Sequence, residues 1–288
     1  MKKCNYTVET HHIPTSNYKL KVLVVRPETV SGFISGHISD RRPPAILWIH
    51  GGGYVTGMAG MIYMSRALPL VKKYGAVVVT PEYRLAGKDP YPAGLADCYA
   101  ALLYMRDHCE EWGCDPSQIM VGGESAGGGL TAALCMLARD RGQIKIAYQM
   151  PLYPMLDDRD TESSRCNPGI SWGTWRNHVS WRMYLRRLHG RRIPAYAVPA
   201  RQTDYTGLPP AYTFVGDREP FYCETLTYVE ELCQAGVPAQ VDVYPTGLHA
   251  FDMLMPWRRI SRQAAERFEQ AYLYAVEHYH APQEECND

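Results

Sequence analysis

The sequence predicts an α/β fold in which a mostly parallel central sheet is covered by helices on both faces. Short apolar runs recur along the 288 residues, and helical patterns separate them. Glycine and proline mark most of the junctions. Such alternation is typical of successive βαβ units. With 46% hydrophobic residues, the chain can bury the core of one large domain, which we expect to span 1–288.

The first predicted strand is "KLKVLVVRP" (19–27), which alternates and ends at a proline, as an outer strand does. "PPAILWIH" (43–50) and "GAVVVTPEY" (75–83) are continuous apolar runs, typical of strands buried on both faces. Four later runs predict further strands: "QIMVGG", "IKIAYQMPLYP", "PAYTFVG" and "PAQVDVYP". The last of these could lie at an edge of the sheet.

Helices are predicted between these strands. "AGLADCYAALLYMRDHC" and "YCETLTYVEELCQAG" carry apolar residues at helical spacing, and Gly236 ends the second. A helix is expected from Ser125 to about Arg139, and a closing helix over 258–279.

Residues 157–207 interrupt the alternation with a helical, tryptophan-rich insert, which we expect to form a cap over the strand ends where open α/β sheets bind ligands. From Ile170 to Thr203 it has no acidic residue but seven arginines. Either these arginines coat its outer face while Trp172, Trp175 and Trp181 pack inward, or some face the pocket and recognise an anionic substrate.

Composition excludes several functional classes. Zero net charge gives no bulk attraction to nucleic acid, and no apolar run approaches the about 18 residues of a membrane span. No signal-peptide pattern opens the sequence. The nine cysteines, from Cys4 to Cys286, lack metal-ligand spacing, so we expect reduced, mostly buried thiols and a cytoplasmic protein.

The segment "VGGESAGG" (121–128) places Ser125 in a G-x-S-x-G motif between a strand and a helix. In this context the serine is a nucleophile on a strained turn. Such a turn has no room for side chains two residues before and two residues after the serine, and Gly123 and Gly127 occupy these positions. A phosphate-binding loop is the alternative, but its glycine spacings are absent.

An oxyanion hole is predicted in "WIHGGGYVTG", where three glycines follow a buried strand. We expect the amides of Gly52, Gly53 and Ala126 to be the donors, with Gly51 as a further candidate. His50 is interpreted as a structural residue of this loop.

His249 is the predicted general base, because it alone of ten histidines follows a C-terminal strand, in "AQVDVYPTGLHAFD". Its acidic partner should follow the preceding strand, in "AYTFVGDREPFYCE". Asp217 and Glu219 both meet that condition, and their spacing cannot separate them.

Together, the HGGG and GESAGG motifs, "YRLAGKDPYPAGLAD", "GLPPAYTFVGDREPF" and "YPTGLHAF" resemble the hormone-sensitive-lipase family of α/β-hydrolases, which are microbial carboxylesterases. The resemblance covers residue 40 to the last helix and implies the α/β-hydrolase fold. It also implies Glu219 as the acid, since Glu219 fills the first position of the family's D-P-[LF]-x-x-E pattern, and a structural role for Glu224.

Three departures from the family pattern stand out. Glutamate replaces the commoner aspartate, "RLAGKDPYP" replaces R-L-A-P-E in a surface turn, and the N-terminal segment is short. We therefore expect a more open pocket, or one completed by another subunit. The family commonly pairs subunits near the last strand, which implies a homodimer.

The resemblance and the motifs imply a serine carboxylesterase that hydrolyses short acyl esters without a metal or organic cofactor. The alternatives are a deacetylase of acetylated sugars or an amidase with the same triad. A non-catalytic ligand receptor on this scaffold is a further alternative, but such receptors lose the catalytic histidine, and His249 is present.

Overall fold

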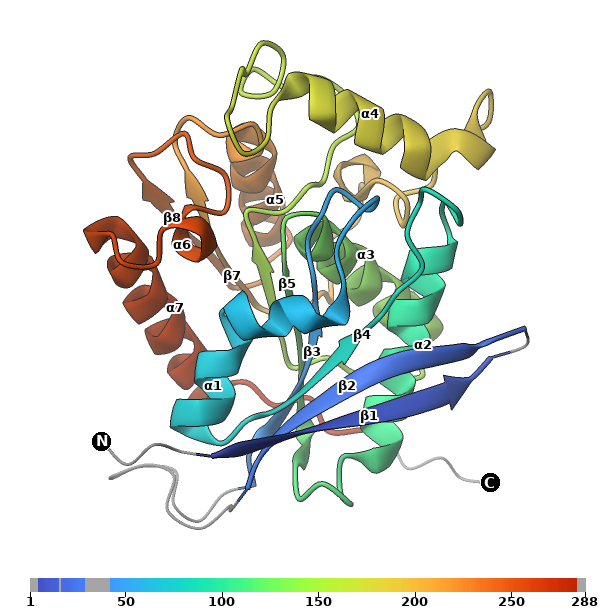
Figure 1. Ribbon diagram of the computed structural model, residues 1–288, viewed down its shortest axis with the longest axis vertical. Helices are drawn as coiled ribbons and strands as arrows, with labels where there is room; N and C mark the ends of the chain where they lie inside the picture. Colours follow the sequence, from blue (N-terminus) through green and yellow to red (C-terminus); the bar gives the residue numbers. More distant parts are fainter. Residues whose placement is uncertain (1–4, 16, 29–41, 284–288) are drawn as a thin grey trace.

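The computed structural model describes residues 5–15, 17–28 and 42–283 (Figure 1). Its centre is one eight-stranded sheet in the order β1-β2-β4-β3-β5-β6-β7-β8. The strands are β1 (Tyr6–Pro14), β2 (Lys19–Pro27), β3 (Pro44–Ile49), β4 (Val77–Pro81), β5 (Asp115–Glu124), β6 (Tyr148–Leu152), β7 (Ala211–Gly216) and β8 (Ala239–Tyr244). Strands β3 to β8 are parallel, whereas β1 and β2 run antiparallel to their neighbours.

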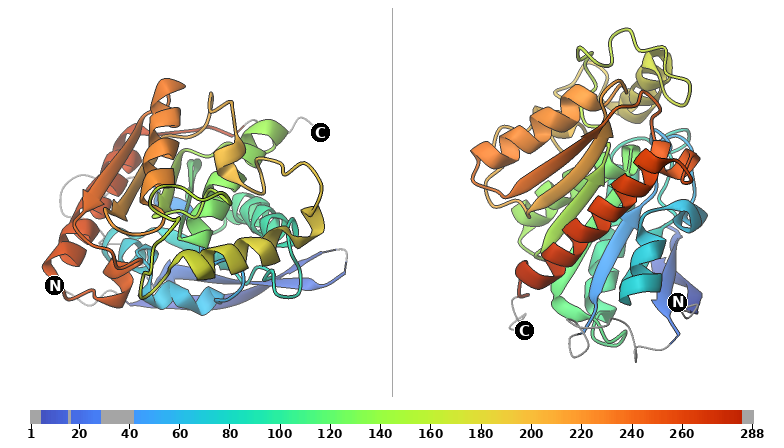
Figure 2. Two further views of the ribbon diagram at one scale, coloured as in Figure 1. Left: turned by 90° about the horizontal axis from the view of Figure 1, so that it is seen from above. Right: turned by 90° about the vertical axis from the view of Figure 1, so that its left-hand side faces the viewer.

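Helices cover both faces of this sheet, as the sequence predicts (Figure 2). One core packs under α1 (Ala67–Tyr74) and α7 (Arg259–His278). The other lies under α2 (Ala93–His108), α3 (Ala126–Arg141) and α5 (Tyr222–Gln234). The fold is that of an α/β-hydrolase.

Strand β1 forms one edge of the described sheet, and no pattern in the sequence predicts it. Its residues, YTVETHHIP, are mostly polar and only partly buried, so they lack the apolar alternation of a typical strand. The prediction that residues 19–27 form an outer strand is therefore wrong, because β1 pairs with the side of β2 that would otherwise be the edge of the sheet. At the other end, β8 is the edge strand, as expected.

Smaller differences concern the starts of elements. The run "IKIAYQMPLYP" was expected to be strand throughout, but β6 begins only at Tyr148. Three short helical elements were not predicted: η1 (Ala59–Met64), α1 and α6 (Phe251–Leu254). Two of them, η1 and α6, follow the loops that carry HGGG and His249.

The 157–207 segment lies between β6 and β7 and contains α4 (Thr174–Leu185), η2 (Arg186–Leu188) and η3 (Pro199–Arg201). In Figure 1, α4 lies at the top, beyond the ends of the central strands. None of the helices in the described part of the chain has both the length and the apolar character that a membrane crossing requires.

Candidate active site

Ser125 lies on the turn between β5 and α3, with a φ of 58° that is rare for a residue with a side chain. The turn packs tightly on the end of β3. A Cβ added at Gly123 would lie 2.4 Å from the carbonyl oxygen of Ile49, and one at Gly127 would lie 2.0 Å from it. Any larger residue at these two positions would push the turn away from β3, which explains the spacing of the motif.

Two hydrogen bonds join Ser125, His249 and Glu219, which come from loops after three different strands. The Nε2 atom of His249 lies 2.8 Å from Oγ of Ser125, and its Nδ1 atom is hydrogen-bonded to Oε2 of Glu219. Glu219 also accepts a 2.7 Å hydrogen bond from the amide of Gly216, which fixes the carboxylate. All three side chains are buried.

The structure separates the two acidic residues that the strand spacing left equivalent. Asp217 is exposed and pairs with the neighbouring Arg218. Glu219 turns inward to His249. Glu224 is buried elsewhere and accepts a 2.7 Å hydrogen bond from the amide of Leu156, and its burial raises its pKa well above the usual value.

The HGGG loop lies beside the nucleophile. A Cβ added at Gly51 would be 3.3 Å from Cβ of Ser125. Gly52 and Gly53 both have positive φ, at 115° and 60°. Ala126 is the first residue of α3, where amides have no partner within the helix. The four predicted oxyanion residues thus come from the two loops that meet at Ser125.

His50, in the same loop, makes contacts that fit its interpretation as a structural residue. Its ring stacks on Tyr83 with centroids 4.2 Å apart, and its Nδ1 lies 2.8 Å from the carbonyl oxygen of Gly51. Burial lowers the pKa of His50, which favours the neutral ring.

Trp172, in the 157–207 segment, lies over the HGGG loop and was not predicted to touch it. A Cβ added at Gly53 would be 2.2 Å from Cη2 of this indole, and the ring centroid is 6.3 Å from that of His249. The adjacent Ser171 donates a 3.0 Å hydrogen bond to the carbonyl of His249. Ser125 itself is only 6% exposed.

The seven arginines between Ile170 and Thr203 either bond to groups of the chain or are exposed. Arg176 donates to the carbonyls of Ile170 and Ser171, and Arg201 pairs with Asp158 at 2.8 Å. Arg186 donates to the carbonyls of Gly87 and Lys88, in the turn where "RLAGKDPYP" departs from the family pattern. Trp172 and Trp181 pack inward, but Trp175 is 74% exposed.

A buried charged cluster lies behind the nucleophile, formed by Glu124, Asp252 and Arg66. Nε of Arg66 is 3.1 Å from a carboxylate oxygen of Asp252, whose other oxygen accepts a 2.9 Å hydrogen bond from Tyr153. The indole N–H of Trp48 donates to Glu124 at 2.8 Å. Burial, together with repulsion from Asp252, raises the pKa of Glu124 to about 8.

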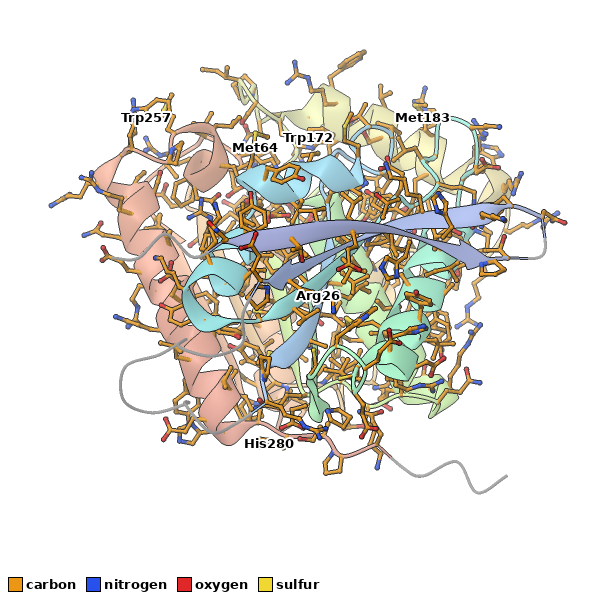
Figure 3. All side chains as sticks on the ribbon, turned by 60° about the horizontal axis from the view of Figure 1, so that its bottom comes forward. Arg26, Met64, Trp172, Met183, Trp257 and His280 are labelled. Atoms are coloured by element: carbon orange, nitrogen blue, oxygen red, sulfur yellow. The ribbon has the colours of Figure 1, made fainter. Side chains whose placement is uncertain are left out.

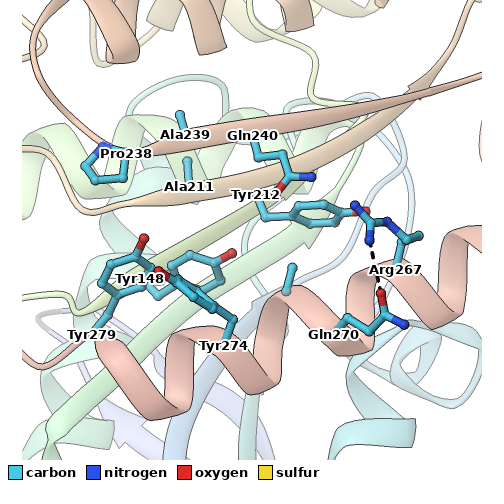
Figure 4. A pocket seen from close by; sticks show the side chains of 11 residues that line it. Tyr148, Ala211, Tyr212, Pro238, Ala239, Gln240, Arg267, Gln270, Tyr274 and Tyr279 are labelled. Carbon is cyan, nitrogen blue, oxygen red and sulfur yellow. Dashed lines mark hydrogen bonds between the residues drawn. The ribbon is translucent and has the colours of Figure 1, made fainter.

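Among the described residues, no group of three or more histidine, cysteine, aspartate and glutamate side chains could hold a metal ion. The seven described cysteines are free thiols, four of them buried, while Cys4 and Cys286 lie outside the described residues. A hollow of about 390 Å³ is lined by Tyr212, Arg267 and Tyr274 (Figure 4). It lies where β6, β7 and β8 begin, at the opposite ends of the strands from Ser125.

Residues 46–253 match the family described as the α/β-hydrolase fold. Carboxylesterase NlhH of Mycobacterium tuberculosis is 31% identical over 213 residues, which are 72% of this chain and 66% of the relative. Esterase LipI of the same species is 32% identical over 210 residues, which are 72% of this chain and 65% of LipI. The chain thus matches slightly less than two thirds of the length of these curated relatives.

Solved structures of esterases have the same fold. A bacterial heroin esterase is 33% identical, and its match has a TM-score of 0.80. The match covers 91% of this chain and 82% of the heroin esterase chain. Esterase LipW of Mycobacterium marinum is 27% identical, and its match has a TM-score of 0.84. The match covers 94% of this chain and 82% of the LipW chain.

Proposed function

The chain belongs to the α/β-hydrolase family of hormone-sensitive-lipase-like carboxylesterases, and on that premise we propose that it is a serine carboxylesterase for short acyl esters. The observation that carries the proposal is the hydrogen-bonded chain from Ser125 through His249 to Glu219. Serine, imidazole and carboxylate in this order form the triad of serine hydrolases.

In the proposed mechanism, His249 takes the proton of Ser125 as Oγ attacks the ester carbonyl. Glu219 accepts the Nδ1–H hydrogen bond, which keeps Nε2 free to act as the base and stabilises the imidazolium that forms. Amides of Gly52, Gly53 and Ala126, with Gly51 as a further candidate, hold the oxyanion.

His249 then gives its proton to the departing alcohol, which leaves an acyl group on Ser125. A water molecule attacks this acyl-enzyme while His249 again acts as the base. The acid is released, and the serine recovers its proton. The reaction uses only groups of this chain and water.

Trp172 supports the proposed preference for short acyl groups. Its indole occupies the space beside Gly53, next to the proposed oxyanion donors, where a long acyl chain would compete with it. Free cysteines in the described part of the chain support a reducing compartment, and we propose the cytoplasm as the site of action.

The test is kcat/KM over p-nitrophenyl esters from acetate to dodecanoate, with matched acetamides and acetylated sugars alongside. We expect the highest values for acetate to butanoate. A mass increase at Ser125 after an organophosphate would support the nucleophile. Activity that survives in Ser125→Ala, or hydrolysis of amides above esters, would overturn the proposal.

A further inference from the structure

We propose that a hollow between η1, α1 and α6 docks this protein on anionic lipid surfaces. The hollow has a volume of about 440 Å³. One wall comes from Tyr63, Met64 and the start of α1, and the other from α6 and the loop up to Trp257. We call it the η1–α6 hollow. The proposal concerns a binding surface and does not depend on the proposed esterase activity.

Exposed apolar side chains gather at this hollow. Ten large hydrophobic residues of the described chain are exposed, and four of them, Tyr63, Met64, Leu254 and Trp257, line this one site. Trp257 has 68% of its surface exposed. Single exposed hydrophobic residues are ordinary, but a cluster around one hollow marks an interaction site.

The charge around the hollow is of one sign. None of the residues that line it is an aspartate or glutamate, and Asp252, the acidic residue of α6, is fully buried and paired with Arg66. Next to Trp257, Arg258 and Arg259 are exposed, and so is Arg262 one turn on. No ion pair joins these three arginines to another residue in the described part of the chain.

Other charges near the hollow are already engaged. Arg66 is held by Asp252, Lys73 by Glu269, and Lys72 lies over the ring of Tyr6 at 4.9 Å. Glu266, one turn beyond Arg262, is the first acidic residue along α7. The arginines beside Trp257 are therefore the free charges that a ligand would meet.

This combination fits the surface of an anionic bilayer. Tryptophan favours the boundary between acyl chains and water, where its ring is partly buried and its N–H stays hydrated. Arginines beside it would meet lipid phosphates, and no acidic residue that would repel them lines the hollow. Leu254 and Met64 would enter the same boundary layer, as in proteins that lie on a membrane without crossing it.

The hollow lies on the same side of the molecule as the candidate active site. In Figure 3, the labelled Trp257, Met64 and Trp172 all lie along the upper side of the view. Both walls also continue from the catalytic loops, since η1 follows HGGG and α6 follows His249. Docking would therefore bring Ser125 towards esters dissolved in the lipid.

The experiment is flotation of the full chain with vesicles of phosphatidylcholine alone or with phosphatidylglycerol added, at low and high salt. We expect binding to the anionic vesicles that salt weakens, and at least about tenfold weaker binding to neutral ones. Trp257→Ala should weaken anionic binding about fivefold or more. The Arg258→Gln, Arg259→Gln pair should remove most of the salt-sensitive part.

Matched controls are Tyr274→Ala, an exposed aromatic residue further along α7, and the pair Arg191→Gln, Arg192→Gln, which are consecutive exposed arginines elsewhere. Both should bind as the unchanged protein does, and all variants should keep their melting temperature and their rate on a soluble acetate ester. Absence of binding to anionic vesicles would overturn the proposal, as would equal loss in the controls. A mass that falls by half in Trp257→Ala, without vesicle binding, would assign the surface to a second copy of this chain.

Discussion

The indole ring of Trp172 occupies the position that a side chain at Gly53 would need, since an added Cβ there would come within 2.2 Å of Cη2. We propose that the size of this indole limits the length of the acyl group that the site accepts. We expect Trp172→Ala to raise kcat/KM for octanoate relative to acetate about tenfold. With the indole removed, the additional methylene groups of octanoate can be buried, and their burial stabilises the transition state. The measurement is the ratio of the two values in each variant.

Trp175→Ala is the matched control for Trp172→Ala. It removes an exposed tryptophan three residues further along and should leave the ratio unchanged. If Trp172→Ala merely lowered both rates in proportion, the indole would not set the acyl preference.

Substitutions in the proposed triad should separate the two acidic residues. Ser125→Ala and His249→Ala should each lower kcat/KM by about 10⁴-fold or more without unfolding the protein. Glu219→Gln should cost about 10²- to 10⁴-fold, because the amide cannot stabilise the imidazolium. Asp217→Asn, at an exposed position, should cost less than about threefold. A larger loss in Asp217→Asn than in Glu219→Gln would contradict the assignment.

Glu124 should make the folded protein less stable as pH rises. Its carboxyl has an ordinary pKa of 4.5 when unfolded and a pKa of about 8 in the fold. Between these values the folded state holds a proton that the unfolded state has released. The unfolded state therefore binds fewer protons, and the free energy of unfolding falls as pH increases through this window.

Glu124→Gln should remove that dependence, since an amide does not titrate and its oxygen can still accept from Trp48. We expect the variant to lose less stability than the unchanged protein between pH 5.5 and 8, measured by urea unfolding at each pH. Parallel curves for the two proteins would show that Glu124 does not titrate in this range.

The seven arginines between Ile170 and Thr203 should not select charged substrates. Arg176, Arg186 and Arg201 already bond to backbone carbonyls or to Asp158, and the other four are exposed. We therefore expect neutral and anionic esters of equal size to give kcat/KM values within about threefold, with little effect of salt. A strong anionic preference that Arg182→Gln abolishes would contradict this.

The oligomeric state can be tested at β8, the edge strand at the other end of the sheet from β1. In the described part of the chain, β8 pairs with β7 alone, and Val243 on this strand is 44% exposed. Because proteins seldom leave such an edge uncovered, we propose a homodimer. Light scattering at micromolar concentration should give twice the 32.6 kDa mass of the chain. Val243→Lys should shift the mass towards the monomer, and a monomeric mass in the unchanged protein would refute the dimer.

Much of the fold could be predicted because the strands of the parallel sheet are continuous apolar runs. β1 could not be, since an edge strand buries little and its polar residues carry no strand signal. For the same reason β2 was assigned to the edge: Pro27 marks the end of the strand, but nothing in its own residues shows that a further strand pairs with it.

At the candidate site, local motifs predicted Ser125, His249 and the glycine loop. A nucleophile, a general base and an oxyanion hole each require particular residues at fixed positions next to a strand end. The choice between Asp217 and Glu219 depends on which side chain turns inward, which the resemblance anticipated and the spacing alone did not. The contacts of Trp172 with Gly53 and of Arg66 with Asp252 join residues over a hundred positions apart. Only the folded chain reveals such pairs.

The position of the 157–207 segment has a consequence for how such a protein can change over generations. This single uninterrupted stretch, entered after β6 and left before β7, supplies Trp172 but none of the proposed triad or oxyanion groups. Gene segments encoding other versions of it could replace it and alter which esters are accepted, while the chemistry is inherited intact. A replacement would have to keep or substitute the hydrogen bonds that join the segment to the rest of the chain, among them the one from Ser171 to the His249 carbonyl and those from Arg186 to Gly87 and Lys88.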